Sequence, residues 1–173
     1  MESISTRRIT RSGLTAALYV ALTLSLSSLS YGSIQFRIAE AMLLLCLFSK
    51  DHIYSLTFGC FIANIFSSVG FIDTVVGTSA TLLAAMCIYG LREKLNLLTA
   101  SLFPVVFNAV IVGIELKLVL KLPLLTSMAG VAIGELVCVT VIGSILFKVL
   151  STNKQFMRIL SDDIDNKSVQ RLN

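Results

Sequence analysis

The sequence has little charge for its length. Charged residues make up 14% of its 173 residues, whereas a soluble globular domain carries roughly 25%. Of its 24 charged residues, 12 lie before position 12 or from Lys148 onward, so only 12 remain across residues 12–147. Twelve charged residues are too few to cover the surface of a soluble domain of that size. This excludes a soluble enzyme and a disordered tail. The net charge of +4 is spread between apolar runs and forms no basic patch, which excludes a nucleic-acid-binding protein.

Groups that usually perform catalysis are also scarce. The one histidine, His52, is expected on a solvated turn beside Lys50 and Asp51, so no Ser-His-Asp type of triad can be assembled. There is no Walker A sequence and no glycine-rich phosphate loop, so the chain cannot hydrolyse ATP by itself. The four cysteines lie in separate apolar segments without C-x-x-C spacing, and we interpret them as buried small hydrophobic residues. The sequence therefore predicts neither a cofactor, a metal site nor an enzymatic activity.

Long apolar runs are what the chain has in abundance, since 55% of its residues are hydrophobic. A helix needs about 20 mostly apolar residues to cross a hydrocarbon core of about 30 Å. Runs of this kind occupy residues 12–36, 53–72, 74–91, 95–114 and 122–147, the last containing only Glu135. A shorter run at residues 38–49 carries Glu40. The chain is thus expected to be an all-α integral membrane protein with five or six spans.

The distribution of basic residues favours six spans. With six spans and an inner N-terminus, nine basic residues fall on the inner side and three on the outer side, as the positive-inside rule requires. Five spans would place Lys50 on the same side as Arg37. The predicted organisation is a cytoplasmic segment at residues 1–11, a six-helix bundle at residues 12–150 and a cytoplasmic tail at residues 151–173. The start of the chain also resembles a signal peptide, but its long apolar run and the spans that follow favour a membrane helix.

Polar residues within the apolar runs are the candidates for a binding site. Asn108 and Glu115 are seven residues apart and so share a helical face, and Glu135 lies about 15 Å into the last span. We expect these three to converge on a cavity open to the outside, with Arg37 and Glu40 at its rim. The alternatives are that Arg37 pairs with Glu40 and that Glu115 is an ordinary interface residue. Intramembrane carboxylates without metal-ligand companions indicate binding rather than catalysis.

Small residues recur at helical spacing on the first span. Ala17 and Ala21 form a small-xxx-small face of the kind that lets helices approach closely. Such a face either packs inside the bundle or contacts a partner protein.

One segment resembles a known family. Residues 31–40, YGSIQFRIAE, resemble the Y-G-x-x-Q-x-R-x-x-E signature of queuosine-precursor transporters of the QueT type. The resemblance continues in Asn108-Ala109, Gly113-x-Glu115 and Gly134-Glu135, and it covers about residues 10–150. Family members often have Pro after the first Gly, where this chain has Ser33.

The resemblance implies a multi-pass protein of the bacterial plasma membrane that captures substrate for an energy-coupling factor (ECF) importer. Such a substrate-binding S component works with a coupling membrane subunit and two ATPase subunits. Its substrate would be a 7-deazaguanine, such as 7-aminomethyl-7-deazaguanine or queuine. Carboxylates suit the N–H donors and the amine of such a ligand, and aromatic rings suit its flat base. The substrate-binding candidates are Tyr31, Gln35, Phe36, Arg37, Glu40, Asn108, Glu115 and Glu135, and the partner-interface candidates are Ala17 and Ala21.

Three alternatives remain open from the sequence. The chain could be an S component for another small vitamin-like substrate. It could be a proton-coupled carrier that works alone through Glu115 and Glu135, or a structural membrane protein in which the carboxylates only hold helices together.

Overall fold

The computed structural model describes residues 6–30, 35–67, 70–150 and 152, and every regular element in that part of the chain is a helix. The elements are α1 (Thr6–Ser25), α2 (Ser27–Ser30), a 3₁₀ helix η1 (Ile38–Leu47), α3 (Asp51–Ile65), α4 (Phe71–Leu91), α5 (Leu97–Leu120), α6 (Leu124–Glu135), a π-helical stretch η2 (Leu136–Gly143) and α7 (Ser144–Leu150). The last three form one continuous rod, Leu124–Leu150.

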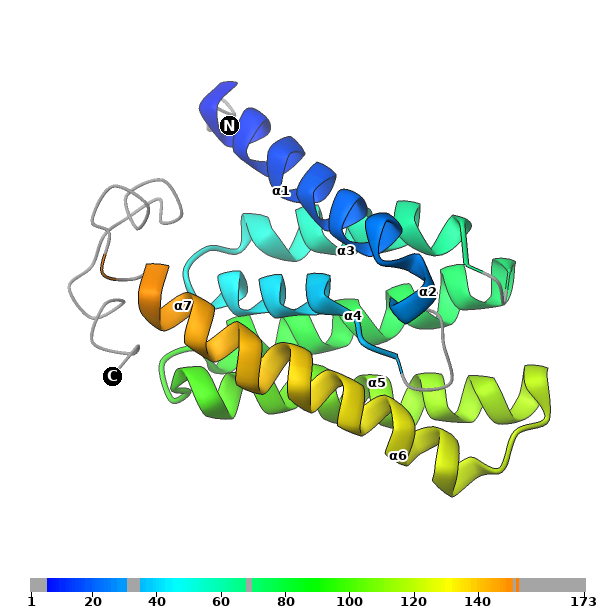
Figure 1. Ribbon diagram of the computed structural model, residues 1–173. Helices are drawn as coiled ribbons and strands as arrows, with labels where there is room; N and C mark the ends of the chain where they lie inside the picture. The colour runs from blue at the N-terminus through cyan, green and yellow to red at the C-terminus, as the bar shows by residue number, and fades with distance from the viewer. Residues whose placement is uncertain (1–5, 31–34, 68–69, 151, 153–173) are drawn as a thin grey trace.

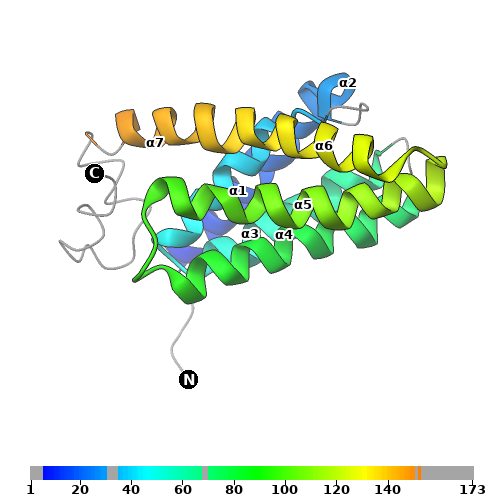
Figure 2. The same cartoon turned by 90° about the horizontal axis from the view of Figure 1, so that it is seen from below.

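The helices form a bundle around η1. Consecutive helices pack against one another from α3 to α6, and α1 packs against α3. Figure 1 shows α1 along one side of the bundle and the rod Leu124–Leu150 along another, with η1 between them. Figure 2, turned by 90°, shows the same rod running beside α5. The central element η1 contacts α1, α3, α4, α5 and η2, so residues on it can meet side chains from most of the bundle.

The short apolar run at residues 38–49 folds differently from the full-length membrane helix that a count of six spans implies. Residues 35–37 are not helical, and the helix that follows is a 3₁₀ helix of 10 residues. A 3₁₀ helix rises about 2.0 Å per residue, so η1 covers about 20 Å where an α-helix of equal length would cover about 15 Å. Eight of its ten residues are buried. The 3₁₀ form thus lets a short segment pass through much of the bundle.

Other helix ends depart from the sequence expectation for identifiable reasons. Helix α5 begins at a capping box in which the Asn96 side chain accepts from the Thr99 N–H. It continues to Leu120, beyond the predicted end at residue 114, and stops at Lys121, which adopts a left-handed conformation. Glu115 therefore lies inside the helix. His52, predicted to be solvated, is instead buried in the first turn of α3.

The surface of the described bundle is apolar and its interior contains polar side chains. Large hydrophobic residues such as Phe71, Leu118 and Leu125 are more than 70% exposed. Three helices in the described part of the chain are long and apolar enough to cross a membrane: Phe71–Leu91, Leu97–Leu120 and Leu124–Leu150. Helix α3 has only 15 residues, and α1 begins with three arginines. The helical membrane architecture is as predicted, whereas the count of six spans and the position of the termini stay predictions.

Candidate functional site

Nine polar side chains are buried between the middle of the bundle and one of its ends. They come from α1, η1 and the segment before it, α3, α4, α5 and α6, and none is more than 3% exposed. We call this set the polar cluster: Tyr19, Arg37, Glu40, Asn64, Asp73, Thr81, Asn108, Glu115 and Glu135. Arg37 and Glu40 are among the most deeply buried residues, whereas the sequence placed them at a rim.

Glu40 is held by two hydroxyl groups. Its Oε1 accepts a hydrogen bond from the Tyr19 hydroxyl of α1 and one of 2.9 Å from Thr81 Oγ1 of α4. Its other oxygen, Oε2, has no hydrogen-bond partner among the described residues. Since η1 starts at Ile38, Glu40 sits in its first turn, next to the extended segment. The carboxylate is therefore fixed at one oxygen and open at the other.

Arg37 pairs with an acid from a different helix than the sequence suggested. Its Nη2 lies 3.4 Å from Asp73 Oδ1 in the first turn of α4. Asp73 also accepts a hydrogen bond from the Ser67 hydroxyl, and its backbone carbonyl accepts one of 3.3 Å from Asn64 Nδ2. A Cβ at Gly77 would lie only 2.7 Å from Asn64 Nδ2 and 2.8 Å from Asp73 Oδ1. The glycine one turn after Asp73 thus leaves the space that these side chains occupy.

The last span contributes an amide–carboxylate pair. Asn108 Nδ2 donates a hydrogen bond of 2.9 Å to Glu135 Oε1, so α5 and α6 bring these two residues together as their spacing predicted. Asn108 Oδ1 and Glu135 Oε2 have no partner among the described residues. Glu135 is the last residue of α6 and is followed directly by the π-helical stretch η2. Such stretches are frequent at functional sites, because the wider turn re-aims neighbouring side chains.

Glu115 differs from the other acids of the cluster. It is 3% exposed, and neither of its carboxylate oxygens has a hydrogen-bond partner among the described residues. The charges that act on it are those of Asp73 and Arg37. It therefore belongs electrostatically to the same cluster, two helical turns along α5 from Asn108.

The polar cluster is acidic and rich in open acceptors. Arg37 is within electrostatic range of four carboxylates, those of Glu40, Asp73, Glu115 and Glu135. Six side-chain oxygens in and beside the cluster have no hydrogen-bond partner among the described residues: Gln35 Oε1, Glu40 Oε2, Asn108 Oδ1, both oxygens of Glu115 and Glu135 Oε2. Buried acceptors are costly to leave unpaired. The arrangement can therefore receive a ligand that donates several hydrogen bonds or carries positive charge.

The other predicted site residues have different surroundings. Gln35 is buried, and its backbone crosses α6 at Gly134 so closely that a Cβ there would collide with the Gln35 carbonyl. Phe36 is half-buried and packs against the hydrophobic core. Tyr31 lies outside the described residues. That these residues bind substrate stays a prediction.

Sequence reasoning missed part of the cluster. Tyr19, Asn64, Asp73 and Thr81 were not chosen as site residues. Their common signal was visible: each is a polar residue in or beside a predicted span. The cysteines are free and mostly buried, as predicted, and Cys60 also accepts a hydrogen bond from Asn64 Nδ2.

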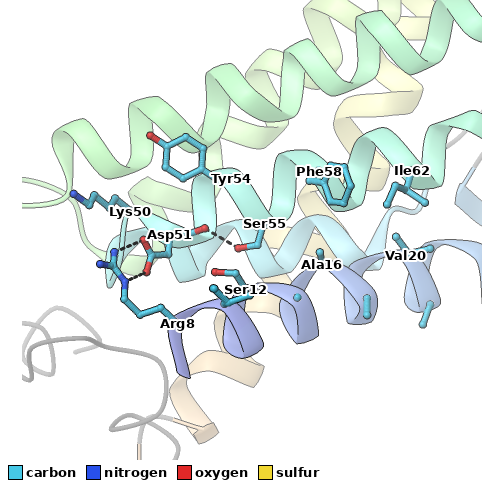
Figure 3. A pocket seen from close by; sticks show the side chains of 14 residues that line it. Arg8, Ser12, Ala16, Val20, Lys50, Asp51, Tyr54, Ser55, Phe58 and Ile62 are labelled. Carbon is cyan, nitrogen blue, oxygen red and sulfur yellow. Dashed lines mark hydrogen bonds and ion pairs between the residues drawn. The ribbon is translucent and has the colours of Figure 1, made fainter. Parts of the chain in front are cut away.

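A second feature is an open groove of about 990 Å³ between α1 and α3, shown in Figure 3. Ala17 and Ala21 line it and are exposed, so they do not pack inside the bundle. Helices α1 and α3 approach most closely at Gly59, where a Cβ would lie 3.0 Å from the Ala16 carbonyl oxygen and 3.0 Å from Tyr19 Cβ. Aromatic and aliphatic side chains of α3, including Phe58, form the other wall.

One end of the groove carries an ion-pair cluster. Arg8 donates to both oxygens of Asp51, at 2.9 Å to Oδ2 and 2.6 Å to Oδ1, and Arg11 Nη2 lies 3.1 Å from Oδ2. The Arg8 hydrogen bonds, followed by the charges of both arginines, lower the pKa of the Asp51 carboxyl below its ordinary value. The cluster ties the first turns of α1 to the first turn of α3.

Comparison with known proteins identifies the family. The model of the QueT transporter family matches residues 9–152. The queuosine precursor transporter QueT of Lactococcus lactis subsp. cremoris (strain MG1363) is 34% identical over 148 residues, which cover 78% of this chain and 87% of the relative. No solved structure matched. Both the family and the relative are transporters and not enzymes, and the chain belongs to the QueT transporter family.

Proposed function

We propose that this chain is the substrate-binding S component of an ECF importer and that it captures a queuosine precursor, a 7-deazaguanine, from outside the cell. The L. lactis relative, a queuosine precursor transporter, supports the substrate class. The sequence contains no phosphate-binding loop, so uptake driven by ATP would require a separate ATPase, as in an ECF importer.

The observation that carries the substrate assignment is the set of open acceptor oxygens in the polar cluster. The guanine edge of a 7-deazaguanine presents an N–H and an adjacent amino group, which together suit one carboxylate. Glu135 is the best candidate for this contact, since Asn108 holds one oxygen and leaves Oε2 open. Glu40 offers a second open oxygen. The base also has a carbonyl acceptor, which the amide of the buried Gln35 can meet.

Calorimetry on the full chain in detergent tests this assignment against a panel of deazapurines. Glu135→Gln replaces an acceptor oxygen with a donor that faces another donor. This costs about 2–4 kcal/mol, or about 30- to 1,000-fold in affinity. The same substitution at Glu93, which is exposed between α4 and α5, is the matched control and leaves affinity unchanged. Tight binding by Glu135→Gln, or no binding of any deazapurine by the parent, contradicts the proposal.

The proposed arrangement in the plasma membrane has six spans with both termini in the cytoplasm. The positive-inside distribution supports it, as does the apolar surface around a polar interior. Accessibility labelling of single cysteines introduced at Lys94 and Lys121 checks it. In intact cells we expect reagent to reach position 121 and not position 94, because these residues flank the two ends of α5.

We propose that the coupling membrane subunit binds in the groove between α1 and α3. Its α1 wall is made of small residues, which allow close approach of a partner helix. Ala17→Leu or Ala21→Leu fills the groove, so we expect substrate binding to be kept and transport by the assembled complex to fall strongly. Val106→Leu adds bulk at an exposed position of α5 outside the groove and serves as the control. Normal transport by both alanine variants overturns this assignment.

Reconstitution separates the S component from the two alternative functions. Liposomes that contain only this chain are expected to bind the deazapurine without accumulating it. Sustained uptake under a proton gradient would indicate a carrier that works alone. Absence of small-molecule binding would indicate a structural protein.

A further inference from the structure

The four carboxylates of the polar cluster are not equivalent. Three have partners: Glu40 is bonded to two hydroxyls, Asp73 to Arg37 and Ser67, and Glu135 to Asn108. Glu115 is also buried, with 3% of its surface exposed, yet both of its oxygens lack a partner among the described residues. It is therefore the acid with the largest unmet demand for a hydrogen-bond donor.

The electrostatic surroundings of Glu115 favour a charged donor. Asp73 repels its negative charge, whereas Arg37 attracts it, but Arg37 is shared with Asp73, Glu40 and Glu135. One guanidinium cannot balance four carboxylates. A buried carboxylate is tolerated when it is paired and hydrogen-bonded, and an ammonium group supplies both the charge and the donors.

The position of Glu115 along α5 separates it from the acid that suits the guanine edge. Seven residues on one helical face place it about 10 Å along the helix axis from Asn108, which holds Glu135. A flat base bound at Glu135 would therefore direct groups on its far side toward Glu115. In a 7-deazaguanine the substituent on the five-membered ring lies on that far side.

We propose that Glu115 recognises a primary ammonium group on the ligand and thereby makes the protein select amine-bearing deazapurines over uncharged ones. This inference rests on the proposed function and assigns the two ends of the ligand. Glu135 receives the guanine edge, and Glu115 receives the amine. Glu40 has only one oxygen without a hydrogen-bond partner, and we assign that oxygen to a ring N–H of the ligand.

A two-ligand comparison on the full chain in detergent tests the inference. The probes are 7-aminomethyl-7-deazaguanine, which is cationic, and 7-cyano-7-deazaguanine, which is not. The parent should bind the amine more tightly. Glu115→Gln should lower affinity for the amine by at least 10-fold while changing affinity for the nitrile by less than about 3-fold. Glu135→Gln should lower affinity for both.

The control variants separate charge from shape. Glu115→Asp keeps the charge but shortens the side chain, so its loss should be smaller and confined to the amine. Thermal unfolding of each variant without ligand shows whether the fold is kept, and Glu115→Gln should be no less stable because an unpaired buried charge has been removed. If a variant does not fold, the comparison of the two probes on the parent protein still tests the inference. Equal affinity of the parent for both probes contradicts it.

Two failures have different meanings. If the parent binds neither probe, the proposed function is wrong and this inference falls with it. If the parent binds both but Glu115→Gln lowers both affinities by the same factor, deazapurine binding stands and the assignment of Glu115 to the amine is overturned.

Discussion

The two ends of the bundle are built from different chemistry, although the same helices form both. At one end lie the start of η1 and of α4 and the end of α5, which carry Glu40, Asp73 and Glu115. At the other end lie the later part of η1, the end of α4 and the start of α5. Their buried residues are mostly apolar, such as Leu44 and Ile88, and Phe48 stacks on Phe147 at 6.3 Å.

The difference between the two ends supports the proposal that the polar end binds a ligand. The outer surface of the helices is already apolar, and an apolar interior would be the least costly solution throughout. The apolar end has a largely apolar interior of this kind. The polar end instead buries one guanidinium and four carboxylates, several with open oxygens. Burying charged groups costs free energy. A binding site needs such groups at one end of the bundle, whereas a structural protein does not need them.

The largest expected effect on stability is at the centre of the polar end. Arg37→Met removes the positive charge from among four carboxylates and leaves Asp73 buried without its ion pair. Breaking a buried pair in this way costs about 3–5 kcal/mol of unfolding free energy. Thermal or denaturant unfolding in detergent measures it.

Arg37→Lys is the matched control, because it keeps the charge and loses only the fork geometry. It should retain more of the stability than Arg37→Met. If Arg37→Met is as stable as the parent, the cluster is not held together by this residue, and the comparison between the two ends loses its main support.

A change at the apolar end should affect stability without affecting binding. Leu43 is fully buried in the hydrophobic core. Leu43→Ala removes its side chain and is expected to cost about 2–5 kcal/mol, depending on how far the site collapses. Affinity for the deazapurine, measured at a temperature where the variant is folded, should stay within about 2-fold. A large loss of affinity would mean that the two ends are coupled.

The smallest effect is expected outside both ends, at the ion pairs of Asp51. Asp51→Asn removes a partly exposed interaction with Arg8 and Arg11, so its cost should be about 1 kcal/mol or less at neutral pH. Because folding lowers the pKa of this carboxyl, its contribution is present at neutral pH and is lost as the pH falls through the lowered value, below about 4. The parent and the variant should therefore converge in stability in acid. A gap that persists there contradicts this account.

Much of the fold followed from patterning, and less of the site did. The apolar runs indicated an all-helical membrane protein, because a membrane helix must present a long uncharged stretch whatever it packs against. Asn108 and Glu135 were expected to converge on one cavity, and the structure shows a hydrogen bond between them. The 3₁₀ form of η1 could not be predicted, since nothing in the local sequence distinguishes it from an ordinary short helix.

What the sequence by itself determined is the class of molecule, an all-helical membrane transporter of the QueT family, together with the polar residues that its interior must accommodate. Only the tertiary structure determined which of these polar side chains interact with one another. Arg37 reached Asp73 across 36 residues, and Glu40 is held by Tyr19 and Thr81 from two other helices. Such pairings depend on where helices cross, as at Gly134 and Gly77, where the missing Cβ lets another segment or side chain come close. Helical periodicity gives the face of a residue on its own helix, but it does not specify which helix that face will meet.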